Sequence, residues 1–141
     1  MSLCRYIHYR QKTVPKNLLC LFMLPLLGAC AEQQTAFKAS DMPRFDAEEL
    51  SMGRSVWVGT CRNCHLLGVA GAPAVTNYPA WSPRIAKGKQ LLYVSALNGV
   101  RDGQGEIRMP PRGGNSRLSE DQVKRAVDYM VASVEKLNEG D

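Results

Sequence analysis

Cys61-Arg62-Asn63-Cys64-His65 is the stretch of this sequence that decides its fold. Two thiols three positions apart are brought together by a short turn of helix, and an imidazole follows directly. This spacing is that of c-type haem attachment. Each sulfur adds to one vinyl group on the same edge of a haem, and the histidine takes one axial position on the iron. We therefore predict one covalent haem c, bound through Cys61 and Cys64, with His65 as an iron ligand.

Three other interpretations of this motif remain open: a zinc site, dithiol redox chemistry and a chance occurrence. Zinc takes about four ligands, usually from two separated pairs, and residues 30–141 contain no second Cys or His pair. A redox-active CxxC follows a strand in a βαβ unit, and the sequence has no such pattern. Haem attachment is the interpretation that these observations favour.

Residues 1–29 resemble the signal sequence of a bacterial lipoprotein. Four basic residues precede an apolar run over residues 18–27, which is short for a bilayer span. The run ends in Leu27-Gly28-Ala29-Cys30, and in lipoproteins of this kind the chain is cut before the cysteine, whose sulfur carries a diacylglycerol. An export signal cut after Ala31 and a retained membrane helix remain as alternatives. All three predict a location outside the cytoplasm.

The positive charge of the chain is concentrated in that leader. The sequence has 18 basic and 13 acidic residues, a net charge of +5, and residues 1–29 hold four of the basic residues and no acidic one. The remaining residues therefore carry 14 basic against 13 acidic side chains. This balance gives no support for nucleic-acid binding. His65 is the only histidine after the leader, so the domain is expected to hold a single haem.

We predict three parts for the chain: the signal peptide 1–29, a lipid attachment site with a flexible tether over 30–45, and an all-α domain over 46–141. A first helix is expected to start at Asp46, as its N-cap, and to run into the haem motif.

The other helices are expected in the second half of the domain. Ser119 and Gln122 have capping-box spacing before an apolar stripe with helical periodicity, which predicts a long C-terminal helix. A short helix is expected over residues 88–97, and a helical turn around Trp81. No strand alternation is visible.

Met109 is the candidate for the second axial ligand of the iron. It lies 44 residues after His65, outside any periodic helix, and is followed by Pro110-Pro111 and Gly113-Gly114. Prolines stiffen a loop and glycines let it turn sharply, which suits a segment that holds a thioether against a metal. The other methionines after the leader lie in the tether, on the helix before the motif, or in the apolar stripe: Met42, Met52 and Met130.

In combination, six stretches resemble the bacterial cytochrome c5 family of class I monohaem c-type cytochromes. They are residues 61–65, 68–73, 80–84, 95–99, 109–114 and 126–130, and the similarity covers residues 46–137. The resemblance implies a class I cytochrome c fold of about three to five helices wrapped around one covalent haem. Two features depart from the family. A second cysteine pair after the methionine loop is absent, and residues 100–108 are longer and more charged than usual.

The resemblance also implies roles for single residues. Pro73 would offer its carbonyl oxygen to the ring nitrogen of His65 that does not bind iron, and Trp81 and Arg84 would reach a haem propionate. Gly53 and Trp57 would meet Tyr129 where the terminal helices cross.

The function expected from these observations is electron transfer in the periplasm rather than catalysis. Redox proteins (a respiratory dehydrogenase, oxidase or reductase) are the expected partners, with no nucleic acid and no small-molecule substrate. A dedicated cytochrome subunit or redox partner of one membrane dehydrogenase or oxidase is the alternative. A haem sensor or peroxidase needs an open axial position, against which Met109 and the lack of a distal histidine argue. A lipid on Cys30 would anchor the protein, and Ala31 favours the outer membrane over the inner, because lipoproteins retained in the inner membrane carry aspartate there.

Overall fold

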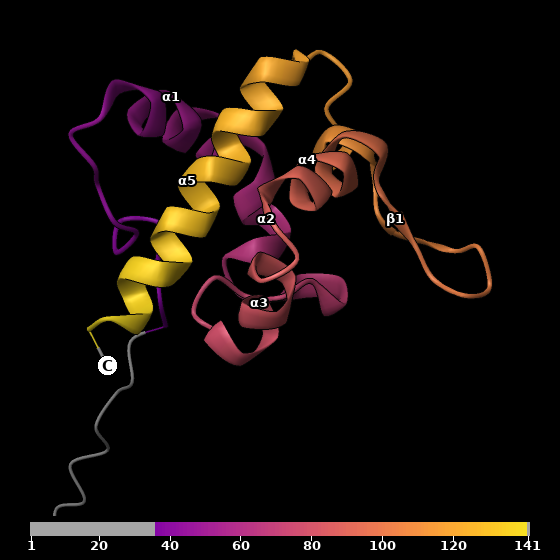
Figure 1. Cartoon of the computed structure of the whole chain (residues 1–141), viewed down its shortest axis with the longest axis horizontal. Coiled ribbons are helices and arrows are strands. Elements are labelled where there is room, and N and C mark those ends of the chain that lie inside the picture. Colours follow the sequence, from indigo (N-terminus) through magenta and orange to yellow (C-terminus); the bar gives the residue numbers. More distant parts are fainter. Residues whose placement is uncertain (1–35, 141) are drawn as a thin grey trace, which may run out of the picture. The chain divides into compact units, whose positions relative to one another are not determined.

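The computed structural model describes residues 36–140 (Figure 1). The predicted signal sequence, Cys30 and the first residues of the predicted tether lie outside this range. The described helices are α1 (Glu48–Val56), α2 (Arg62–His65), α3 (Tyr78–Ile85), α4 (Lys89–Asn98) and α5 (Glu120–Asn138), with short helical turns η1 (Trp57–Cys61), η2 (Val69–Gly71) and η3 (Pro111–Gly114), and strands β1 (Val100–Arg101) and β2 (Ile107–Met109). The predicted all-α class is confirmed, with one small hairpin added.

Helices α1 and α5 cross at a single glycine. A Cβ atom on Gly53 would lie 2.1 Å from the carbonyl oxygen of Arg125, so only glycine lets the two backbones approach this closely. Trp57 and Tyr129 are fully buried beside the crossing, with ring centroids 5.8 Å apart. The packing role expected for Gly53 and Trp57 is confirmed.

Helix α5 begins with the predicted capping box. The Ser119 hydroxyl accepts a hydrogen bond from the Gln122 backbone N–H at 3.2 Å, and the Gln122 side chain accepts one from the Ser119 N–H at 2.9 Å. Its apolar stripe is shared between two neighbours: Ala126, Met130 and Val134 belong to the core cluster that includes Trp57, and Val123, Val127 and Val131 pack with α4. Within residues 36–140, no helix is long and apolar enough to span a bilayer.

Helix α1 does not begin as predicted. Its N-cap is Ala47, in an extended conformation and without a side-chain hydrogen bond, so the expected cap at Asp46 is wrong by one residue. Glu48 and Glu49 lie in the first turn instead, where their charges interact favourably with the helix dipole. The helix therefore begins without a side-chain cap, and with two acidic residues in its first turn.

Residues 36–45, called here the N-terminal segment, pack against the helices, and this corrects the prediction of a flexible tether extending to residue 45. Met42 is only 2% exposed. The Tyr129 hydroxyl donates to the carbonyl oxygen of Pro43 at 2.9 Å, and the Phe45 ring meets the Tyr129 ring edge-on, with centroids 6.0 Å apart. Isolated apolar residues in a polar stretch have no periodicity, and so the sequence pattern did not reveal this packing.

Strands β1 and β2 form an antiparallel hairpin that the sequence analysis did not predict. Val100 pairs with Met109, and Arg101 pairs with Ile107, with an irregular register between the two pairs. The Asp102 carboxylate orders the turn, since one of its oxygens accepts the backbone N–H groups of Gln104 and Glu106, each at 3.0 Å. Strands of two and three residues are too short to produce a visible alternation. The hairpin extends away from the helices in Figure 1.

Candidate haem site

The CxxCH motif lies at the end of one continuous helical run that starts with α1. The turn η1 is π-helical, and such a turn is rare and often marks a functional site. Cys61 is half-buried and Cys64 is exposed, and neither forms a disulfide within the described residues. Burial is the main cause that raises the pKa of the Cys61 thiol to about 11, with a smaller contribution from Cys64. Before a haem is attached, Cys61 is therefore a protonated thiol at neutral pH.

His65 is held in a fixed orientation by the loop that follows it. Its Nδ1 lies 3.0 Å from the carbonyl oxygen of Pro73, which is the contact implied by the family resemblance. The Val75 N–H also donates to the His65 carbonyl oxygen at 2.8 Å. Since Nδ1 is engaged, Nε2 is the nitrogen available to a metal.

The environment of His65 favours the neutral imidazole. Burial lowers the pKa of His65, the hydrogen bond to Pro73 opposes this effect, and the nearby charge of Arg84 lowers the pKa further. A histidine that binds a metal must be in the neutral form, because a protonated ring nitrogen has no lone pair to offer. The side chain is thus prepared for coordination by the protein alone.

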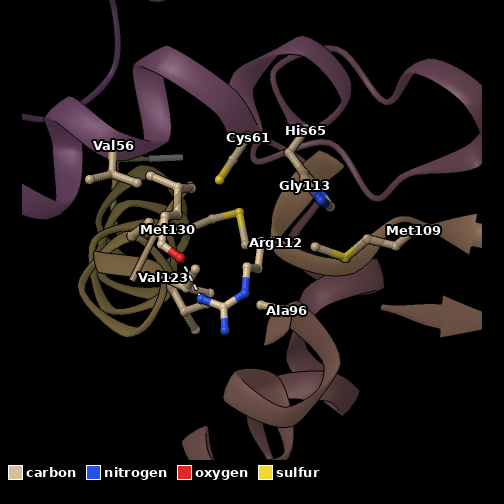
Figure 2. A pocket seen from close by; sticks show the side chains of 12 residues that line it. Val56, Cys61, His65, Ala96, Met109, Arg112, Gly113, Val123 and Met130 are labelled. Carbon is tan, nitrogen blue, oxygen red and sulfur yellow. Dashed lines mark hydrogen bonds between the residues drawn. The ribbon is translucent and has the colours of Figure 1, made fainter. Parts of the chain in front are cut away.

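An apolar cavity lies in front of this histidine (Figure 2). The helix α5 contributes Val123, Ala126, Val127 and Met130, and the other elements contribute Cys61, His65, Met109 and Arg112. About 360 Å³ of space, its open mouth included, is not filled by protein atoms. The cavity therefore carries a thiol, a neutral imidazole and a thioether on an apolar wall. This set of groups fits a haem, because the haem ring is apolar and its iron accepts nitrogen and sulfur ligands.

Met109 comes to this cavity from the end of β2. The turn η3 follows it, with Arg112 and Gly113 in the left-handed region at φ 54° and 64°. Behind the methionine, a Cβ atom on Gly99 would lie 2.6 Å from the Met109 carbonyl oxygen and 2.9 Å from the Pro111 nitrogen. The backbone conformation of this loop therefore brings Met109 to the same cavity as His65, as its predicted role requires.

Trp81 and Arg84 both lie on α3 and both have acceptors within the protein. The Trp81 indole N–H donates to the carbonyl oxygen of Ala74 at 2.8 Å, and its ring centroid lies 5.7 Å from that of His65. The Arg84 guanidinium donates to the carbonyl oxygen of Ala80. Trp81 thus supports the loop that holds His65, and contact of either residue with a propionate stays a prediction.

Arg112 is a charged residue of the cavity that was not predicted from the sequence. Its guanidinium donates to the carbonyl oxygen of Leu118, and Figure 2 shows the side chain crossing the cavity toward α5. The one signal in the sequence was its position between Pro110-Pro111 and Gly113-Gly114. A lone arginine in such a loop is usually a solvated surface charge.

The crossed terminal helices and the thiol and histidine geometry are those of a class I monohaem c-type cytochrome. Residues 48–130 match the family described as cytochrome c oxidase, cbb3-type, subunit III, and the chain belongs to this family. It is similar to cytochrome c-555 of Chlorobaculum tepidum, with 39% identity over 85 residues that cover 60% of this chain and 77% of that protein. It is also similar to cytochrome c5 of Ectopseudomonas mendocina, with 31% identity over 72 residues that cover 50% and 76%.

A solved structure gives the same result for the fold. The chain is similar to one in the crystal structure of an electron transfer complex of nitrite reductase with cytochrome c, with a TM-score of 0.51 and 34% identity, covering 59% of this chain and 94% of the other. The class I cytochrome c fold, the covalent haem c at Cys61 and Cys64, and a role as a haem-based electron carrier are thereby confirmed.

Proposed function

We propose that this protein is a lipid-anchored periplasmic shuttle that carries single electrons between respiratory proteins, with His65 and Met109 as the two axial ligands of its iron. The ligation by His65 and Met109 is the part that the structure supports most strongly. The two side chains are 44 residues apart in sequence and line one apolar cavity. A bound haem supplies an iron that changes by one electron between two oxidation states.

The protein contributes rigidity and exclusion of water. His65 is fixed by Pro73, and Met109 is fixed by the hairpin and by the close packing at Gly99. Both ligands can therefore stay in place during a change of oxidation state. The apolar wall from α5 would keep water from a bound haem iron, which would favour the less charged form of the iron centre. Fixed ligands and an apolar surrounding are the main requirements of an electron carrier. These features support an electron-transfer protein rather than an enzyme.

The anchoring and the location rest on the leader sequence. A diacylglycerol on the Cys30 sulfur and an acyl chain on its amine together give stable membrane attachment, whereas one chain alone binds marginally. Intact mass spectrometry of the membrane-extracted protein tests this. Residues 30–141 with haem and the acyl chains are expected, and an unmodified soluble chain beginning at Glu32 would contradict the anchor.

A second candidate is a dedicated redox partner or subunit of one membrane oxidase or dehydrogenase. The description of the matched family, a subunit of a cbb3-type oxidase, favours it. Extraction of native membranes in a mild detergent distinguishes the two. Stoichiometric co-purification with one enzyme supports the dedicated role, and purification as a separate protein that several membrane enzymes oxidise or reduce supports the shuttle.

The axial ligation is tested by Met109→Ala. The variant should keep its covalent haem, lose the weak long-wavelength absorption band of Met–Fe(III) ligation, and have a lower reduction potential, because a thioether favours the ferrous form. Met52→Ala is the matched control, since Met52 is exposed on α1. Retention of the band and of the potential in Met109→Ala would show that another group binds the iron.

A further inference from the structure

The N-terminal segment shortens the connection between the domain and the proposed anchor. The Lys38 N–H donates to the Asp41 carboxylate at 2.7 Å, the Arg54 guanidinium donates to the carbonyl oxygen of Ala39 at 3.4 Å, and Phe37 packs against the core. Residues 31–35 lie in sequence between Cys30 and this described segment. Even fully extended, this connection spans about 20 Å.

A groove opens on the surface at the point where this connection meets the domain. We call it the Leu67 groove; it lies between residues 36–39 and the side chains that follow the first haem cysteine. Leu67 and Val69 are 59% and 54% exposed. Phe37 and Leu66, half-buried, join the groove to the core. An exposed apolar surface of this kind marks a site of interaction with a partner or a membrane.

The charges around the groove are suited to an anionic surface. Lys38 and Arg62 are the charged side chains that line it among the described residues. Asp41 lies close by in sequence, but its carboxylate accepts hydrogen bonds from the Lys38 N–H and the Ser40 hydroxyl. Apolar side chains bordered by cations are the pattern of surfaces that lie on anionic lipid.

We propose that the Leu67 groove is the face on which the domain rests on the membrane that holds its anchor. Leu67 and Val69 enter the boundary of the acyl chains, and Lys38 and Arg62 bind anionic lipid head groups. This inference rests on the lipid attachment at Cys30 in the proposed function. The short connection gives the groove a high effective concentration at the bilayer, so that weak individual contacts suffice.

This orientation has a consequence for electron transfer. Arg62 lies between the two haem-bonded cysteines, so contact of the groove with lipid holds the haem-attachment turn at the membrane surface. Electron exchange is then directed to membrane-bound proteins, and long-range diffusion is restricted. An acidic protein partner in the same groove is the competing occupant, and the experiment distinguishes the two.

The test is photo-crosslinking from the groove. The full-length haem-loaded protein is produced with p-benzoylphenylalanine in place of Leu67, and in place of Ile107 in a matched control, because Ile107 on the hairpin is 54% exposed. Each protein is reconstituted in vesicles of phosphatidylethanolamine and phosphatidylglycerol, irradiated and digested. Several-fold more lipid adduct at position 67 than at position 107 is expected. Equal adducts at the two positions would overturn the inference.

The same two variants are irradiated in intact cell envelopes. Lipid adducts at position 67 support the membrane face, and predominant adducts to another polypeptide would overturn it in favour of protein docking. Intact mass of the same samples reports acylation independently. A chain without acyl groups removes the anchor and the inference together, whereas an acylated chain without enrichment at position 67 removes the inference alone.

The charge contribution is tested separately with Lys38→Glu. In vesicles that contain phosphatidylglycerol, this change should reduce the lipid adduct at position 67 several-fold, because a cation near the head groups is replaced by an anion. Arg117→Glu, at an exposed site outside the groove, is the control. Equal adduct yields in the two variants would overturn the proposed role of Lys38.

Discussion

The two sides of the haem cavity hold their side chains in different ways. His65 is buried at the end of the helical run that crosses α5, and its Nδ1 is hydrogen-bonded to the carbonyl oxygen of Pro73. Met109 lies at the end of a short hairpin, and its position depends on left-handed backbone in η3 and on a close approach to Gly99. The first side is held by core packing and the second by backbone conformation.

This difference predicts different effects of substitution. A change on the histidine side disturbs the larger of the two clusters of buried apolar residues and acts on folding. A change on the methionine side leaves that core intact and is expected to act on the proposed ligation by Met109 and on the reduction potential. The predictions that follow test this contrast.

The largest effect is expected from Gly53→Ala at the helix crossing. The new methyl group would lie 2.1 Å from the carbonyl oxygen of Arg125, so α1 and α5 must separate. We expect the free energy of unfolding to fall by about 3 kcal/mol, measured by denaturant titration of the haem-loaded protein. Gly59→Ala is the control, since no atom lies within 4 Å of its added Cβ. If both variants unfold at the same denaturant concentration, the crossing does not dominate stability.

On the methionine side, Gly99→Ala should act on the ligand. Gly99 has φ 79°, and a Cβ atom there would lie 2.6 Å from the Met109 carbonyl oxygen. The strained backbone should cost about 1–2 kcal/mol of unfolding free energy, and part of the Met–Fe(III) band should be lost with a lower potential. Gly103→Ala, in the turn of the same hairpin, adds a methyl group with no atom within 4 Å. A band unchanged in Gly99→Ala would contradict the claim that this contact positions Met109.

The histidine side and the methionine side of the cavity also differ in how much of each the sequence predicts. The CxxCH motif, the Ser119 capping box and the apolar stripe of α5 are local or periodic signals, and the structure has them where the sequence indicates. The contact between His65 and Pro73 was expected only through family resemblance, because a side-chain bond to a carbonyl eight residues away has no spacing rule.

What the sequence did not predict depends on contacts between distant residues. Met42 is buried because Tyr129, 87 positions later, lies next to the segment that carries it. The hairpin that carries Met109 is stabilised by one aspartate that accepts backbone N–H groups, and nothing in its composition marks it as strands. Arg112 reaches the cavity through a left-handed φ, which residue type alone does not indicate.

A smaller effect is expected from Tyr129→Phe, which removes one hydrogen bond from the histidine side. The Tyr129 hydroxyl is the donor to the Pro43 carbonyl oxygen, so the variant loses about 1 kcal/mol of unfolding free energy. Hydrogen exchange of residues 36–45 should become faster, while the Met–Fe(III) band stays unchanged. Tyr78→Phe, at the exposed start of α3, is the control. Unchanged exchange in this segment would mean that packing of Met42 and Phe45 alone holds it.

The smallest effect concerns Tyr93, which joins α4 to α5. Its hydroxyl donates to Asp128 at 2.6 Å, and Lys89 lies 3.0 Å from the same carboxylate. Burial, with the hydrogen bond and charge of Asp128, raises the pKa of Tyr93 from 10.0 to about 12. Because the fold favours the neutral phenol, this stabilisation is complete below pH 10 and is lost as the pH rises to about 12.

Tyr93→Phe removes both the hydrogen bond and this titration. At neutral pH the unfolding free energy should fall by about 0.5 kcal/mol, since Lys89 still neutralises the carboxylate. The loss of stability between pH 10 and about pH 12 should be shallower than in the unmodified protein. Asp128→Asn keeps an acceptor for the hydroxyl but removes the charge, so its pH profile should fall between the other two. If the profiles of unfolding free energy against pH are the same for Tyr93→Phe and the unmodified protein, a group other than Tyr93 titrates between pH 10 and about pH 12. The contact between α4 and α5 would then not be the cause of the pH dependence.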